Sequence, residues 1–167
     1  HNALEVDDLV AFREGLEART EEPPLALVVT GAGDRTFCAG ASLGDVTGGA
    51  AVWTENPLTA LCDALEDFPA PTVCALNGSV YGGGAEIALA CDFRAGRPGM
   101  KVMVPPARLG IHYEPKGIAR AVQRLGAQAA RRLFLLAETV EGEALLTTGF
   151  LDRVGEDPAA EADALAE

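Results

Sequence analysis

Two short glycine-rich stretches carry the residues of this chain best suited to chemistry. One reads FCAGASL over residues 37–43, and the other reads NGSVYGGGAEI over residues 77–87. Small side chains let a ligand approach main-chain N–H groups, and glycines ahead of an apolar run are typical of a loop that opens a helix. One N–H from each stretch could point at the same carbonyl oxygen and stabilise negative charge there. This predicts an oxyanion hole for chemistry through an enolate or a tetrahedral intermediate, without a metal or a covalent nucleophile.

Both stretches belong to a longer series of motifs that resembles the crotonase superfamily, the enoyl-CoA hydratase/isomerase group. The matching segments follow the family's order: NAL at 2–4, the segment 25–31 leading to FCAGA at 37–41, PTV at 71–73, NG at 77–78, GGGAE at 82–86, CDFR at 91–94, and the segments 105–110 and 149–154. Several motifs in the right order are far more specific than any single one. The chain is therefore identified as a member of this superfamily.

The resemblance assigns the two oxyanion-hole donors to the N–H groups of Ala41 and Gly83. Gly83 is expected at a helix N-terminus, where the helix dipole adds positive potential. Close packing of a helix on a strand would explain an isolated GGG, but its pairing with the first stretch favours the functional interpretation. Six other residues are expected to contact the substrate: Ala39, Ser42, Leu43, Tyr81, Gly82 and Pro106.

Glu86 and Pro106 decide which reaction the site could perform. Glu86 is expected in the first helical turn, where a carboxylate caps the helix or favours its dipole; in the hydratases that it resembles, this glutamate is an acid–base catalyst. An apolar pocket would raise its pKa towards a useful range. Pro106 stands where many family members have a glutamate that is the second catalytic carboxylate of hydratases and the main base of many isomerases, and proline has no proton to give. Hydration needs one group to activate water and another to protonate the α-carbon, so standard hydration is in doubt.

Three polar residues lie close to Pro106 in sequence: His112, Tyr113 and Glu114. Tyr113 matches a tyrosine of methylmalonyl-CoA decarboxylase, a relative that needs the oxyanion hole but no base. Tyr113 and His112 are therefore candidate catalytic residues beside Glu86. A loop histidine without a catalytic role explains His112 equally well.

Other kinds of site fit this sequence poorly. Residues 31–33 (GAG) follow a predicted strand, but the third glycine of a dinucleotide-binding fingerprint would fall at Thr36. No Walker-type lysine follows a glycine-rich loop. His1 and His112 are the only histidines, which leaves little material for a Ser–His–Asp triad or for activating Cys38 as a nucleophile.

The pattern of apolar residues predicts the elements that position these groups. Helices are expected over 6–19, 57–68, 83–90, 117–125, 127–136 and 140–147, and buried strands over 25–30 and 72–76. Residues 93–104 are predicted to form two short strands around a turn at 97–99, and residues 45–56 a loop. Alternating strands and helices imply an α/β fold with right-handed crossovers. The resemblance implies a crotonase-like spiral of ββα units, in a single domain over residues 1–167.

Composition narrows the class of protein. The chain is 49% hydrophobic but only 5% aromatic, so the core must be built from aliphatic side chains. A formal net charge of −12 argues against nucleic-acid binding. The densest basic stretch, residues 120–132, has near-helical spacing and is interpreted as a solvated helix face.

The cysteines and the ends of the chain give the remaining expectations. Cys38, Cys62, Cys74 and Cys91 are widely spaced in apolar settings, which favours buried reduced thiols in a cytoplasmic protein and no metal site. No apolar run has membrane-spanning length, and no signal peptide is recognised. Compared with the family, both ends look incomplete, and the C-terminal helical region looks missing or truncated.

The most specific function that the resemblance implies is an acyl-CoA thioester enzyme that stabilises an enolate, of the enoyl-CoA hydratase/isomerase type. Coenzyme A would enter as part of the substrate, and no other cofactor is expected. Two alternatives stay open: a decarboxylase of malonyl-type thioesters, and a non-catalytic subunit that binds acyl-CoA or acts as a scaffold. The resemblance also implies a homotrimer or a dimer of trimers.

Overall fold

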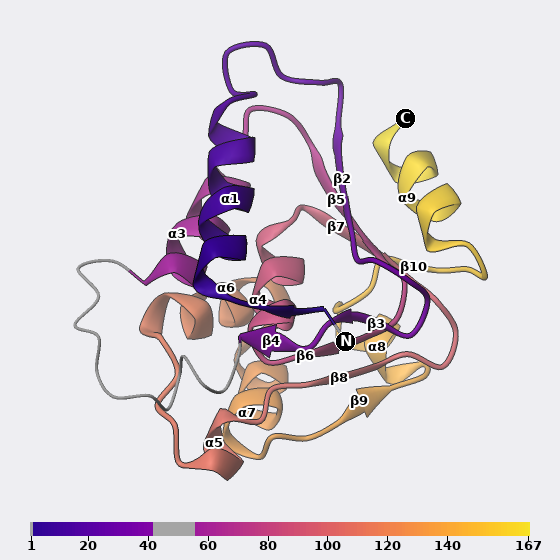
Figure 1. Ribbon diagram of the computed structural model, residues 1–167. Coiled ribbons are helices and arrows are strands. Elements are labelled where there is room, and N and C mark those ends of the chain that lie inside the picture. Colours follow the sequence, from indigo (N-terminus) through magenta and orange to yellow (C-terminus); the bar gives the residue numbers. More distant parts are fainter. Residues whose placement is uncertain (1, 42–55) are drawn as a thin grey trace.

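The computed structural model describes residues 2–41 and 56–167 (Figure 1). Ser42, Leu43 and all but the last residue of the loop expected at 45–56 lie outside these ranges. The strands are β1 (Ala3–Leu4), β2 (Leu27–Thr30), β3 (Thr36–Cys38), β4 (Gly40–Ala41), β5 (Thr72–Leu76), β6 (Ser79–Tyr81), β7 (Phe93–Gly96), β8 (Lys101–Met103), β9 (Val140–Glu141) and β10 (Arg153–Val154).

The helices lie between these strands. They are α1 (Val6–Glu17), α3 (Pro57–Glu66), α4 (Gly83–Ala90), α5 (Pro106–Leu109), α6 (Pro115–Leu125), α7 (Ala127–Leu135), α8 (Ala144–Thr147) and α9 (Pro158–Ala166). Among the described residues, no helix has the length and apolar character needed to cross a membrane.

Successive turns of the chain build two four-stranded sheets side by side. One sheet has the order β10-β7-β5-β2 and the other β3-β6-β8-β9; all pairs are parallel except β8 with β9. The strands β2 and β3, β5 and β6, and β7 and β8 are consecutive along the chain, and each pair gives one strand to each sheet. The α/β fold and the spiral of strand–strand–helix units are therefore confirmed.

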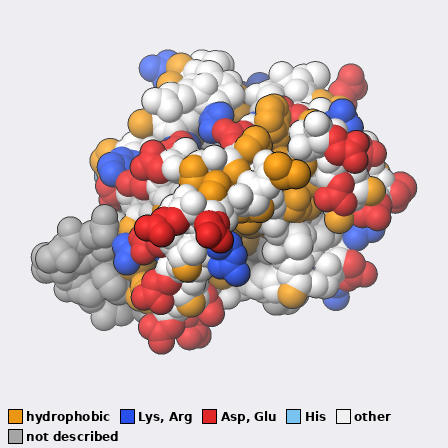
Figure 2. Space-filling model, turned by 90° about the horizontal axis from the view of Figure 1, so that it is seen from above, with side chains coloured by type: hydrophobic (Ala, Val, Ile, Leu, Met, Phe, Trp, Pro, Cys, Tyr) orange, Lys and Arg blue, Asp and Glu red, His pale blue; other side chains and the backbone are white. Residues whose placement is uncertain are grey.

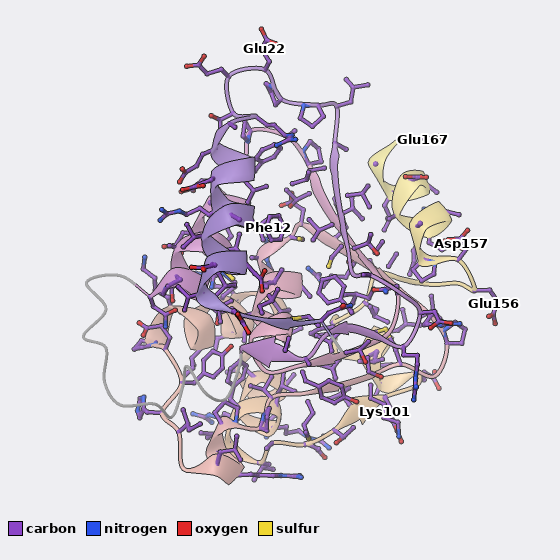
Figure 3. All side chains as sticks on the ribbon, viewed as in Figure 1. Phe12, Glu22, Lys101, Glu156, Asp157 and Glu167 are labelled. Carbon is purple, nitrogen blue, oxygen red and sulfur yellow. The ribbon has the colours of Figure 1, made fainter. Side chains whose placement is uncertain are left out.

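Helices cover both faces of the first sheet. In Figure 1, α1, α3 and α4 lie on one side of the strands β2, β5 and β7, and α9 lies on the other, where it packs across these strands. Asp157, labelled where α9 begins in Figure 3, accepts hydrogen bonds from the N–H groups of Ala159 and Ala160. Phe12, labelled on α1 in the same figure, packs against the main core. All five residues of β5 and all eight of α4 are buried, so these two elements form the centre of the molecule.

Two predictions from local pattern were wrong in part. Residues 140–147 begin as strand β9 rather than as a helix, because Val140 pairs with Val102 and extends the second sheet; Gly142 (φ +60°) then separates β9 from α8. The strand expected at 25–30 begins at Leu27 and is not buried on both faces: Val29 is buried, whereas Val28 and Thr30, on the opposite face of this edge strand, are exposed.

Several large apolar side chains of the first sheet and the segment before it are exposed. Leu25 is 98% exposed, and Val28 and Phe93 are also exposed. Figure 2 shows the molecule from above, with apolar side chains gathered in one continuous area bordered by acidic ones. The acidic border agrees with the large negative net charge of the chain.

Candidate active site

The two glycine-rich stretches meet at the start of α4. Gly40 (φ +86°) and Gly82 (φ +52°) both have backbone conformations that favour glycine. A Cβ added to Gly40 would lie 2.9 Å from the carbonyl oxygen of Tyr81 and 3.2 Å from the nitrogen of Gly83. The backbone of β4 therefore rests against the first residue of α4, as convergence of the stretches requires. The shared direction of the Ala41 and Gly83 N–H groups stays a prediction.

Cys38 packs the first stretch against α4. A Cβ added to Gly84 would lie 2.6 Å from the Cβ of Cys38, and the Gly40 N–H donates a hydrogen bond to its Sγ at 3.3 Å. Burial raises the pKa of the Cys38 thiol, and the bond from Gly40 offsets this only in part. All four cysteines are buried free thiols, as predicted, and Cys38 has a packing role.

Two asparagines outside the expected site residues hold the loops in place. The Asn2 side chain donates hydrogen bonds to the carbonyl oxygens of Ala32, Thr36 and Phe37, at 2.9, 2.8 and 3.1 Å. The side-chain oxygen of Asn77 accepts from the Gly31 N–H, and its amide donates to the Gly33 carbonyl oxygen. The NAL and NG motifs thus have a structural role, since they fix the strand that leads into FCAGA.

Glu86 lies in the first turn of α4, as expected, but its carboxylate is bound by side chains. Only 1% of the residue is exposed. The Tyr113 hydroxyl donates to its Oε2 at 2.8 Å, and Arg120 Nη1 donates to its Oε1 at 2.7 Å. A Cβ added to Gly117 would lie 2.6 Å from Oε2, so the backbone of α6 lies directly against this carboxylate. Both oxygens therefore have partners, in an arrangement that differs from helix capping.

Arg120 corrects the interpretation of residues 120–132 as a solvated helix face. Its side chain is 3% exposed, and its Nη2 donates to Asp63 at 3.0 Å and to Glu66 at 2.8 Å, besides the bond to Glu86. The arginines beyond it are more exposed, as for Arg132. Helical spacing alone gave no sign that α6 packs on α4. The signal that could have found Arg120 is the need of a buried glutamate for a counter-charge.

The charges in this cluster affect one another. Burial raises the pKa of Glu86, while the hydrogen bond from Tyr113 and the positive charge of Arg120 oppose that rise. Burial and the adjacent Glu86 raise the pKa of Tyr113 well above its usual value, so this phenol stays protonated and acts as a donor. Burial lowers the pKa of Arg120, but hydrogen bonding and charge from Glu66 and its other neighbours raise it on balance. Glu86 therefore has a raised pKa and lies beside a guanidinium that stays charged and a phenol that stays protonated.

The other expected site residues have different surroundings. His112 is exposed, with Nδ1 3.1 Å from the carbonyl oxygen of Tyr113, whereas the Tyr113 side chain reaches Glu86 and packs edge-on against Phe134. Pro106 is the first residue of α5 and is half-buried. Ala39 is half-buried, and its N–H donates to the Asn2 carbonyl oxygen.

A model of the enoyl-CoA hydratase/isomerase family matches residues 1–165 of the chain. The chain is 29% identical over 160 residues to the crotonyl-CoA hydratase of Syntrophomonas wolfei, covering 92% of this chain and 60% of that protein. It is 32% identical over 160 residues to the probable enoyl-CoA hydratase echA6 of Mycobacterium leprae, covering 92% and 63% respectively. The chain thus spans about three fifths of the length of these relatives.

Solved structures agree with this relationship. The fold matches Pseudomonas aeruginosa DspI with a TM-score of 0.91 and 30% identity, covering 98% of this chain and 65% of that one. It also matches an enoyl-CoA hydratase from Bacillus anthracis with a TM-score of 0.88 and 25% identity, covering 98% and 66%.

Substituting Gly40 tests whether close approach of the two stretches is essential. Gly33 is the matched control, because it also has a positive φ (+81°) but nothing within 4 Å of an added Cβ. Gly33→Ala should cost about 1–3 kcal/mol of unfolding free energy, the usual cost of a strained backbone. Gly40→Ala should cost clearly more in urea denaturation, because the backbone at Tyr81 and Gly83 must also move. Equal losses at the two positions would contradict the close approach.

Substituting Arg120 tests the buried ion pair. Arg120→Met should lower the free energy of unfolding by about 3–5 kcal/mol, because the Glu86 carboxylate loses its buried counter-charge. Adding Glu86→Met should recover part of that loss. The control, Arg132→Met, breaks an exposed pair with Glu138 and should have a much smaller effect. If Arg120→Met and Arg132→Met unfold at the same denaturant concentration, the buried ion pair is not important for stability.

Proposed function

The chain belongs to the enoyl-CoA hydratase/isomerase family, and we propose that its protein acts on an acyl-CoA thioester by stabilising an enolate. The observation that carries this proposal is the close approach of the Gly40 backbone to the start of α4, where an added Cβ would lie 3.2 Å from the nitrogen of Gly83, one helical turn before the buried Glu86. In the proposed complex, the thioester carbonyl oxygen accepts hydrogen bonds from the N–H groups of Ala41 and Gly83. The positive end of the α4 dipole adds to the stabilisation of the enolate oxygen.

Glu86 is the proposed acid–base group. Its raised pKa lies closer to neutrality than that of an ordinary glutamate, which favours both taking and returning a proton. An acid–base role requires the Tyr113 hydroxyl either to move from Oε2 when substrate binds or to relay the proton. Tyr113 stays protonated beside Glu86, so it can donate a hydrogen bond throughout.

Pro106 replaces the glutamate that serves as a second carboxylate in hydratases and as the main base in many isomerases, so within this proposal either reaction has to rely on Glu86. Hydration divides its work between two groups, and the second carboxylate is absent from this sequence position. Moving a double bond needs only one proton-transferring group. A base removes a proton from the α-carbon, the electron pair of that C–H bond forms the enolate, and the same group returns the proton to the γ-carbon. A single carboxylate such as Glu86 is sufficient for that transfer.

Decarboxylation of a malonyl-type thioester is the second candidate, favoured by a specific observation. Both oxygens of Glu86 are occupied, by Tyr113 and Arg120, which suits a positioning role more than a base. Loss of CO₂ leaves the electron pair of the broken C–C bond in the enolate, so that no base is needed to form it. The departing carboxylate would then be bound by Tyr113, whose hydroxyl would have to turn away from Glu86 to donate to it, or by His112.

Three variants and three substrates separate these reactions. For isomerisation of a 3-enoyl-CoA, Glu86→Gln should lower kcat by about 10²–10⁴-fold with KM nearly unchanged, because the acid–base group is lost. For decarboxylation of methylmalonyl-CoA, Glu86→Gln should be mild and Tyr113→Phe severe. Pro106→Glu should increase hydration of crotonyl-CoA by supplying a second proton-transferring group. Product analysis by mass spectrometry measures all three reactions.

The control is Glu138→Gln, which removes an exposed carboxylate that pairs with Arg132 and should leave turnover unchanged. Tight binding of these thioesters without turnover would contradict both reactions and support a non-catalytic acyl-CoA-binding subunit. Absence of binding would contradict the proposal as a whole.

A further inference from the structure

One guanidinium serves three carboxylates at the centre of the molecule. Arg120 donates through Nη1 to Glu86, and through Nη2 to both Asp63 and Glu66 of α3. Lys116, the neighbouring cation, lies 2.6 Å from Asp63. Three negative groups therefore share the charge of Arg120, and only one of them belongs to the candidate active site.

The carboxylates differ in their access to water. The Glu86 side chain is 1% exposed, whereas those of Asp63 and Glu66 are 33% and 32% exposed. Water can solvate the two α3 carboxylates in part, but Glu86 depends on protein groups to stabilise its charge. Because the two α3 carboxylates pair with the same guanidinium, their negative charges offset part of the positive charge that stabilises Glu86.

We propose that Arg120 is a positioning residue that orients Glu86 and stabilises its carboxylate form, and that Asp63 and Glu66 weaken this effect from α3. The importance for catalysis rests on the proposed acid–base function of Glu86. The proposed stabilisation of the Glu86 carboxylate, and its weakening by Asp63 and Glu66, rest only on the contacts of Arg120.

The groups that act on Glu86 belong to α6, to the segment just before α6, and to α3. From α6 and the segment before it come Arg120, Tyr113 and Glu114; α3 contributes Cys62, besides Asp63 and Glu66 acting through Arg120. Tyr113 and Arg120 favour the carboxylate form, and the negative charge of Glu114 opposes it. Cys62 is buried with a pKa raised well above its usual value, so it is a neutral thiol beside Glu86.

The proposal predicts shifts of opposite sign from substitutions in one cluster. Arg120→Gln removes the stabilising charge and should raise the pKa of Glu86, by about 1–3 units for a close charged partner. Asp63→Asn and Glu66→Gln remove competing negative charges and should lower that pKa, by less, because solvent screens these partly exposed groups. Arg120→Lys keeps the positive charge, so the pKa of Glu86 should stay nearer its original value in this variant. Disruption of packing alone would not produce shifts of both signs.

Carbon NMR of protein labelled at the glutamate carboxyl groups measures these pKa values directly, with Glu86→Gln to assign the signal. Arg132→Gln is the matched control: it removes an arginine that binds a carboxylate at the surface, and the Glu86 pKa should not change. If Arg120→Gln does not fold, Asp63→Asn and Glu66→Gln still test the predicted direction. The proposal is overturned if the Glu86 pKa is unchanged in the folded variants, if it falls in Arg120→Gln, or if it rises in Asp63→Asn and Glu66→Gln.

The NMR measurement needs no turnover, so it is independent of the proposed function. Where the enzyme turns over a 3-enoyl-CoA, the acidic limb of kcat/KM should move with the Glu86 pKa. If the pKa shifts as predicted but the limb does not follow, Arg120 still stabilises Glu86, and the acid–base function of Glu86 is wrong.

Discussion

The buried carboxylate of Glu86 is the constraint on which the surrounding structure depends. A charge cut off from water costs several kcal/mol unless protein groups replace its hydration. The replacement comes from Arg120 and Tyr113, and α6 must approach α4 closely to supply it. Glycine at position 117 suits that approach, since an added Cβ would lie 2.6 Å from Oε2 and the carboxylate would have to move. The carboxylate thus contributes contacts that hold α6 against α4.

The same helix connects this charge to the glycine-rich stretches. Because α4 is buried along its whole length, its first turn is fixed, and β4 and Cys38 pack directly against it. Gly83 and Glu86 are three residues apart in that turn, so a backbone donor and an acidic side chain lie near each other. This arrangement suits a reaction in which charge forms on an oxygen while a proton moves nearby.

The sequence predicted the elements best where one local pattern decides the outcome. Strand β5 and helix α4 have the predicted bounds, and the order of the motifs identified the α/β spiral. Partners distant in sequence were harder to predict: Arg120 reads as one more surface arginine until α6 is placed on α4, and Val140 becomes a strand only because β8 offers it a partner. The edge position of β2 likewise depends on sheet order, which apolar pattern does not reveal. The capping signal at Asp157 and Pro158 was present in the sequence and would have predicted α9.

The central claim, that Ala41 and Gly83 polarise a thioester carbonyl, is tested most directly by its stretching frequency. Acetyl-CoA labelled with ¹³C at the carbonyl carbon can be bound to the protein and observed by isotope-edited infrared difference spectroscopy. Two hydrogen bonds at the carbonyl oxygen should lower the frequency on binding, and Gly40→Ala should abolish or reduce that change. A bound thioester whose carbonyl frequency equals that of free acetyl-CoA in water, in a protein with an intact Gly40, would contradict the proposed oxyanion hole.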